Sequence, residues 1–230
     1  MPVPNLPNPP SRYQPATAIT NAAGTAQLFQ DANTQQLQLI HTGTGKVLAS
    51  VELPQARLLA LGLDASMNRV AFVTQGSAGK ADLQVYDLFK KTTLKTYTIQ
   101  APVAFNQPVV FSPDGNYAAI LPQVINLQTE EVFTVKNATG SAVFTADHQS
   151  LLFAGQQGMQ RLDLSTQQQQ SLALNLPANC RTTVAEDISA DQRRLALASL
   201  CLNDPKVLAM VSFLDARTGQ WQSNLKLTQP

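Results

Sequence analysis

Apolar residues in this chain either alternate with polar ones or run on for about five to seven positions, and turn-forming residues bound each such segment. Amphipathic helices would instead place apolar residues three and four positions apart. Short segments of alternating or continuous apolar character between turn signals are typical of β-strands. The pattern therefore predicts an all-β protein.

The segments repeat along the chain. Five stretches align without gaps, and each contains a strand end, a turn and the start of a second strand. They are residues 19–29, 63–73, 111–121, 144–154 and 188–198. Each stretch is therefore predicted to be the first hairpin of a repeated unit.

The third copy shows the turn chemistry most clearly. Ser112-Pro113-Asp114-Gly115 supplies a fixed φ at proline, a side-chain acceptor at aspartate and a residue free to take a positive φ at glycine. In this alignment Asp147 and Asp191 stand where Asp114 stands, whereas Gly24 comes one place later than Gly115. We interpret the repeated feature as the turn position rather than the residue type.

A second hairpin follows each of these turns at a fairly regular distance. An Asp, an Asn or, in the first unit, a His stands at the turn-entry position, which is the first residue of this hairpin's turn. There a short polar side chain can hydrogen-bond its own backbone two residues on. These residues are His41, Asp87, Asn126, Asp163 and Asp215. Their repetition at one structural position favours a turn-forming role over a catalytic one.

Two hairpins give four strands per unit, and the units are spaced by 44, 48, 33 and 44 residues. The chain resembles the bacterial WD40-like and YVTN-type β-propeller repeats, which carry a Ser-Pro-Asp-Gly turn and an Asp-x-x-Thr-Gly turn. Residues 112–115 match the first motif and residues 215–219 match the second. The resemblance implies a β-propeller of five four-stranded blades.

The predicted organisation is a Pro-rich extended linker followed by one propeller domain. Six prolines fall within residues 1–15, which makes that segment stiff. The domain covers residues 16–230, with blades at approximately 16–53, 54–101, 102–136, 137–177 and 178–230. No strand is left over to clasp the two ends, so two arrangements stay open: a closed ring of five blades, or an arc of a larger ring that a partner or further sequence completes.

The charge balance disfavours two classes of partner. Lys and Arg number 16 against 15 Asp and Glu, for a net charge of +1. A chain without a basic excess is a poor candidate for nucleic-acid or anionic-membrane binding. No apolar run approaches the length of a membrane helix, so we expect no direct membrane insertion, although the N-terminal linker could hold the domain to an anchor or a larger assembly.

Residues with catalytic chemistry are few. The two histidines, His41 and His148, fall in turns of different blades and are expected to be solvated. Phosphate loops, zinc-helix motifs and nucleophile elbows are missing from the sequence, and only Glu186 and Asp187 place carboxylates on a predicted innermost strand. We expect a chain without catalytic residues, metal or cofactor.

Propellers bind through the loops that enter their innermost strands, because these loops converge on the axis at one face. The residues predicted to form this binding face are Arg12, Tyr13, Arg57, Asn106, Gln107, Asn137, Asn179 and Arg181. Three arginines would make the face mildly positive. The alternative interpretation is that these are ordinary rim residues.

Two functions compete at this point. The first is a protein-binding scaffold; the second is a small-molecule or carbohydrate-handling propeller, a lectin or a lactonase-like enzyme, that uses the central funnel. Aromatic residues make up only 6% of the chain, and Trp221 maps to an outermost strand. A funnel poor in aromatic residues favours protein partners.

The two cysteines are predicted to form a disulfide. Across a turn at residues 189–193, facing residues should have numbers that sum to about 382, and Cys180 and Cys201 come within one of that sum. A disulfide implies an oxidising compartment. Together with the bacterial style of the repeats, it predicts an extracytoplasmic location, in a periplasm or at a cell surface.

Overall fold

The computed structural model describes residues 19–228, except 22–23, 32–35, 54–56, 77–79, 100–107, 157, 175, 178–179, 189–192, 202–206 and 219. At 140–141, 181–188 and 208 it describes the backbone alone. The regular structure within this part of the chain is entirely strand. The all-β prediction is confirmed.

The strands form five four-stranded antiparallel sheets, each in chain order. Blade 1 contains β1 (Ile19–Thr20), β2 (Ala26–Asp31), β3 (Gln36–His41) and β4 (Val47–Glu52). Blade 2 contains β5 (Leu58–Leu63), β6 (Arg69–Gln75), β7 (Ala81–Asp87) and β8 (Thr92–Ile99). Blade 3 contains β9 (Val110–Phe111), β10 (Tyr117–Ile120), β11 (Gln123–Asn126) and β12 (Val132–Thr134). Blade 4 contains β13 (Ala138–Phe144), β14 (Ser150–Gly155), β15 (Gly158–Asp163) and β16 (Gln169–Ser171), and blade 5 contains β17 (Cys180–Ile188), β18 (Arg194–Cys201), β19 (Val207–Asp215) and β20 (Trp221–Thr228).

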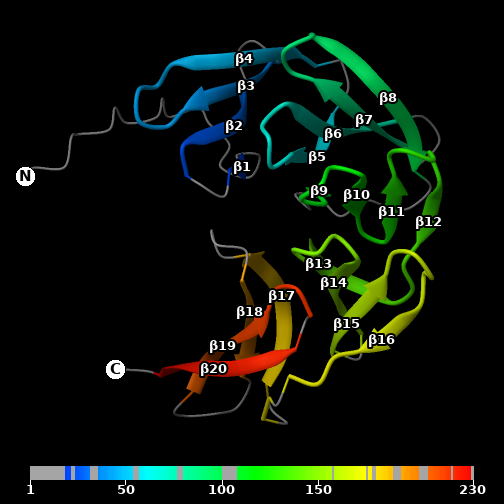
Figure 1. Ribbon diagram of the computed structural model, residues 1–230. Coiled ribbons are helices and arrows are strands. Elements are labelled where there is room, and N and C mark those ends of the chain that lie inside the picture. Colours follow the sequence, from blue (N-terminus) through cyan, green and yellow to red (C-terminus); the bar gives the residue numbers. More distant parts are fainter. Residues whose placement is uncertain are drawn as a thin grey trace, which may run out of the picture.

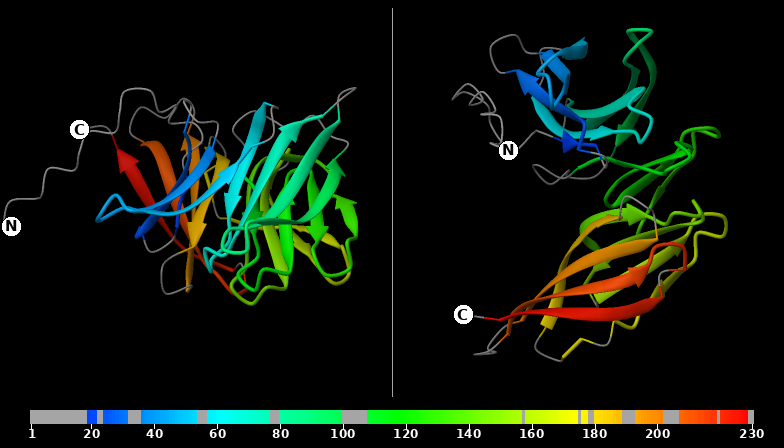
Figure 2. Two further views of the ribbon diagram at one scale, coloured as in Figure 1. Left: turned by 90° about the horizontal axis from the view of Figure 1, so that it is seen from above. Right: turned by 60° about the vertical axis from the view of Figure 1, so that its left-hand side comes forward.

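The blades stand side by side along an arc (Figure 1). The first strand of each blade lies nearest the centre and the fourth lies at the perimeter, and Figure 2 shows the same arrangement of sheets from two further directions. Blade 1 and blade 5 occupy the two ends of the arc. This is the β-propeller arrangement that the repeat predicts.

The first-hairpin turns have one geometry in blades 1 to 4. The residue at positive φ is Gly24, Met67, Gly115 or His148, and its backbone N–H donates to the carbonyl three residues earlier at 2.8–3.0 Å. Gly24 is therefore equivalent to Gly115. The gapless alignment of the first copy is wrong by one residue, because the turn geometry and not the strand pattern fixes the equivalence. The turn around Asp191 lies outside the described residues.

Side chains on the second strand of each blade alternate between its two neighbours. In β14, Leu151 and Phe153 pack towards blade 3, whereas Leu152 and Ala154 pack towards blade 5. We call these sides the preceding face and the following face of a blade. Successive blades are thus joined by apolar clusters, one at each of the four joints.

The joint between blades 2 and 3 also includes a close backbone approach. The N–H of Val109 donates to the carbonyl of Leu61 at 2.9 Å, just before β9. A Cβ atom added at Gly62 would lie 2.1 Å from the carbonyl oxygen of Val109. Glycine is required here because no side chain fits between the two backbones.

The arc is open. Four apolar clusters join consecutive blades, and a fifth, around Cys180, Cys201 and Met210, belongs to blade 5 itself. Within the described part of the chain, no buried apolar cluster joins blade 5 to blade 1, and Figure 1 shows these two blades apart. The described blades therefore form an open arc and not a closed five-blade ring, and completion of a larger ring stays a prediction.

Candidate binding surfaces

The loop face predicted from the sequence is described at only two of its positions. Arg57 and Asn137 are exposed and immediately precede β5 and β13, so both stand where an innermost strand begins. Their carbonyl oxygens accept backbone hydrogen bonds from Gln75 and Gln156. The remaining predicted positions lie outside the described residues, apart from the backbone of Arg181; they are Arg12, Tyr13, Asn106, Gln107 and Asn179. A binding role for this face stays a prediction.

The opposite face carries the two hairpin turns of each blade. In all five blades, the N–H of the residue after the turn-entry position donates to a carbonyl of the first turn, at 2.7–3.0 Å. These bonds fix the second turn to the first. The residues that donate are Thr42, Leu88, Leu127, Leu164 and Ala216.

Carboxylates on this turn face hold turns together. Oδ1 of Asp163 accepts hydrogen bonds from the backbone N–H groups of Ser165 and Thr166 and from their hydroxyls. These donors, the Ser165 hydroxyl first, lower the pKa of Asp163 from 3.8 to about 2. The pKa of Asp215 is lowered in the same way, chiefly by the backbone N–H of Thr218. The predicted structural role of the turn-entry residues is confirmed for these two.

Asp87 and Asn126 also accept two backbone N–H groups each at their turns. His41 differs. Its turn is closed by its carbonyl oxygen, which accepts from Thr44 and Gly45, and its side chain takes no part in these bonds. The prediction of one shared side-chain role is therefore wrong for His41.

The histidines are also less solvated than the sequence predicts. His41 and His148 are half-buried, and the Nδ1 atom of each is enclosed without a hydrogen-bond partner. The two residues stand in turns of blade 1 and blade 4. Groups of three or more His, Cys, Asp or Glu side chains that could hold a metal do not occur among the described residues.

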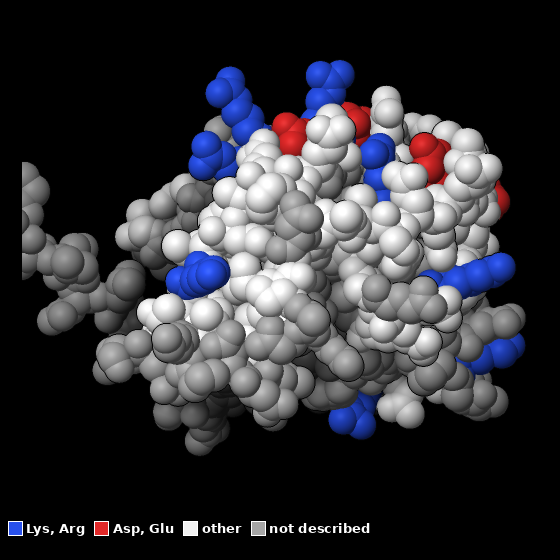
Figure 3. All heavy atoms as spheres, turned by 90° about the horizontal axis from the view of Figure 1, so that it is seen from below, with Lys and Arg blue, Asp and Glu red and all other residues white. Residues whose placement is uncertain are grey.

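A polar hollow lies on the turn face between blades 4 and 5. Its lining is Ala146, Asp147, Arg193, Arg194, Asp215, Arg217 and Gln222. In the view of Figure 3, the visible acidic side chains gather along one edge of the molecule together with several Lys and Arg side chains. Because both charge signs meet and Asp215 already caps its turn, the hollow has mixed rather than anion-binding character.

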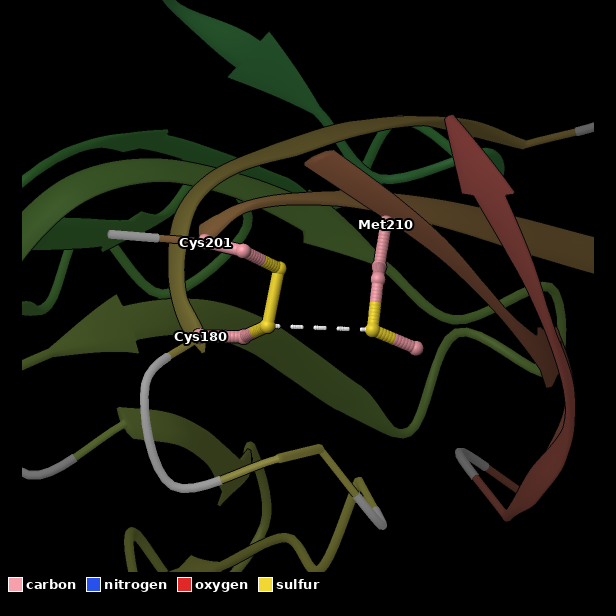
Figure 4. The surroundings of a disulfide bond; sticks show 3 residues. All are labelled: Cys180, Cys201 and Met210. Atoms are coloured by element: carbon pink, nitrogen blue, oxygen red, sulfur yellow. Dashed lines mark hydrogen bonds between the residues drawn. A yellow bond between two sulfur atoms is a disulfide. The ribbon is translucent and has the colours of Figure 1, made fainter. Parts of the chain in front are cut away.

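The predicted disulfide is present in blade 5 (Figure 4). Cys180 on β17 and Cys201 on β18 are paired in register and bonded, and Sγ of Cys180 lies 3.8 Å from Sδ of Met210. Two bulges in β17 create this register. Between the pairs Ile188–Leu195 and Cys180–Cys201, β17 advances eight residues while β18 advances six. Without the two bulges, the pairing that starts at Ile188–Leu195 would place Cys201 opposite position 182.

The following face of blade 5 is apolar, and no sheet among the described residues covers it. Register places its side chains in three cross-strand rows. The rows are Leu200–Ala209–Leu227, Ala198–Val211–Leu225 and Ala196–Phe213–Ser223. Leu200, Leu225 and Leu227 are 51%, 52% and 45% exposed. We call these nine residues the open face; the sequence showed the alternation of these strands but not that one side would lack a neighbour.

The same positions are core positions in the other blades. On the second strand, Leu28, Ala71, Ala119 and Leu152 are at most 1% exposed, whereas their equivalent Ala196 is half-buried. On the third strand, Leu37, Leu83 and Met159 are equally buried, whereas their equivalent Val211 is half-buried. The open face therefore has the composition of a blade–blade interface.

Solved β-propeller structures resemble this chain. The β-propeller domain of Myceliophteria thermophila Cps50 (Swd1) matches with a TM-score of 0.61 and 13% identity over 91% of this chain and 71% of that domain. TolB from Acinetobacter baumannii matches with a TM-score of 0.56 and 19% identity over 92% of this chain and 51% of TolB. Dipeptidyl peptidase 4 of Porphyromonas gingivalis matches with a TM-score of 0.59 and 9% identity over 94% of this chain and 40% of the peptidase.

At these identities the likeness shows the fold alone. The chain has a β-propeller fold, and it spans about half of TolB and less than half of the peptidase. Neither a protein-family model nor a curated protein sequence matches it. Among the described residues, no helix is long and apolar enough to cross a membrane. The narrower resemblance to bacterial WD40-like and YVTN repeats stays a prediction.

Proposed function

We propose that this chain is a non-catalytic β-propeller scaffold that binds a protein partner. The observation that carries the proposal is the open face of blade 5, where eight of nine side chains are apolar and three leucines are strongly exposed. Contiguous apolar surface of this kind on a folded domain marks a protein-interaction site.

The chemistry of the described surface supports a scaffold over an enzyme. Two carboxylates with lowered pKa values, Asp163 and Asp215, are each engaged by backbone N–H groups and hydroxyls of their own turns. A shifted pKa indicates catalysis only where the titrating group takes part in a reaction. In Asp163 and Asp215, the hydrogen bonds that lower the pKa hold the turns in place.

We further propose an extracytoplasmic location, which the Cys180–Cys201 disulfide supports because structural disulfides persist in oxidising compartments. Thiol titration of the denatured, unreduced protein tests this. Blocked thiols are expected; two reactive thiols in protein purified from its native compartment would contradict the location.

The partner is tested by affinity purification from an extract of the native cell, followed by mass spectrometry. The bait is compared with the double variant Val211→Lys, Leu225→Lys, which places charge on the open face. The matched control is Gln170→Lys, a charge on the exposed β16 of blade 4. A protein that is recovered with the wild-type and Gln170→Lys baits but lost with the Val211→Lys, Leu225→Lys bait supports the scaffold. Equal recovery with all three removes the open face from the interaction.

A further inference from the structure

The open face has a shape and composition that specify what covers it. Every other following face in the chain is covered by the preceding face of another four-stranded sheet. The positions that make those contacts are the same ones that blade 5 leaves half-buried, with apolar residues retained at them. The open face thus continues an interface that the molecule already uses four times.

Blade 1 is poorly suited to cover it. On the preceding face of blades 2 to 5, the first core position of the second strand holds Val70, Ala118, Leu151 or Leu195, each fully buried. Blade 1 has Gln27 at this position. On the same face, Gln38 of β3 is paired with Phe29 of β2. Burying an amide without a partner against an apolar sheet costs free energy. This disfavours closure onto blade 1 of the same chain, and it equally disfavours head-to-tail contact with blade 1 of a second copy.

The comparison with a whole propeller indicates how much is missing from the ring. This chain, with five blades, covers 71% of the Swd1 β-propeller domain. At the same length per blade, the uncovered part corresponds to about two blades. The arc therefore leaves room for a two-blade segment between blade 5 and blade 1.

We propose that the partner of the open face is a propeller-blade segment, a pair of four-stranded antiparallel β-sheets carried by a separate polypeptide, whose first sheet presents an apolar preceding face. This deepens the proposed function and rests on it. The segment packs against Ala196, Ala198, Leu200, Val211 and Phe213 as blade 5 itself packs against blade 4. Its far side then meets the more polar preceding face of blade 1.

The test supplies such a segment. A second copy of residues 100–177 is appended after Thr228, so that blades 3 and 4 follow blade 5 through the connection that normally leads into blade 3. The new joint then sets Ala118, Ile120 and Ile125 of the appended copy against the open face. Amide hydrogen exchange in β18, β19 and β20 is expected to slow by about tenfold or more relative to the 230-residue chain, because covered strands open less often.

The control is the same extended chain with Val211→Lys and Leu225→Lys, in which this protection should be lost. Both substitutions are first placed in the 230-residue chain, where an unchanged circular dichroism spectrum shows that they are tolerated. Unchanged exchange in β18–β20 of the extended chain, whether the extension is folded or unstructured, overturns the proposal. So does a dimer of the 230-residue chain by light scattering that the two substitutions abolish, since a second copy would then cover the face.

This result is independent of the affinity purification. Suppose that the extension does not slow hydrogen exchange, while the Val211→Lys, Leu225→Lys bait still loses a partner. The scaffold function would then hold, and only the blade-like nature of the partner would be excluded.

Discussion

Blade 4 and blade 5 are built from the same repeat, yet one is covered on both faces and the other on one. On the following face of blade 4, Leu152, Ala154 and Met159 are buried by blade 5. The equivalent residues of blade 5 meet no further sheet in the part of the chain that the structure describes. The repeat thus encodes a blade with two apolar packing faces, and whether a given face is buried depends on whether another blade follows it.

The largest expected effect separates these two faces directly. Met159→Lys should lower the free energy of unfolding by about 4 kcal/mol or more, because it buries a charge at the blade 4–blade 5 joint. Val211→Lys, at the equivalent position of blade 5, should cost under about 1 kcal/mol because the ammonium reaches solvent. Urea unfolding followed by circular dichroism measures both. Equal losses would mean that the open face is covered in the isolated chain.

Blade 5, which among the described residues has a neighbouring blade on one side only, contains the Cys180–Cys201 disulfide. Replacing both cysteines, Cys180→Ser with Cys201→Ser, should cost about 3 kcal/mol, because the disulfide closes a loop across a sequence separation of 21. The loss should be concentrated in β17–β20, where hydrogen exchange would rise most. An unfolding curve identical to that of the oxidised wild-type chain would show that the bond does not stabilise the blade.

A smaller pair of effects compares a tight joint with the open face. Gly62→Ala adds a methyl group that would contact the Val109 carbonyl and should cost about 2 kcal/mol. Ala198→Val adds apolar volume on the open face and should change stability by less than about 0.5 kcal/mol. Thermal unfolding of the two variants measures the difference. A tolerated Gly62→Ala would show that blades 2 and 3 separate more easily than their backbone contact implies.

The smallest effects should be the same in both blades. Asp163→Ala and Asp215→Ala each remove a turn carboxylate, and solvent exposure keeps the expected loss to about 1 kcal/mol at neutral pH. Because the folded pKa of Asp163 is lowered from 3.8 to about 2, its stabilisation is present above about pH 4 and is lost as the pH falls towards 2. Stability measured between pH 5 and pH 2 should fall less steeply in either variant. A fall in stability that is steeper in one variant than in the other would show that the turn in that blade depends on the neighbouring joint.

Much of the local structure follows from the sequence. Alternating apolar positions predict the strands, Ser112-Pro113-Asp114-Gly115 predicts a turn with a positive-φ glycine, and the spacing of the units predicts five sheets. These features depend on a few neighbouring residues. The pairing of Cys180 with Cys201 is also predicted, although within one residue, because hairpin register is counted from its turn.

Other features depend on how the strands and sheets pack against one another. The two bulges of β17 set the exact cysteine register, and the equivalence of Gly24 with Gly115 is visible only in the turn hydrogen bonds. Sequence alternation shows that Ala196, Val211 and Phe213 share one side of a sheet, but a two-residue period is the same whether that side is covered or open. Closure of the ring and the identity of the uncovered face depend on how whole sheets are placed against one another. Only the packed molecule contains that information, because burial is a property of two surfaces and not of one strand.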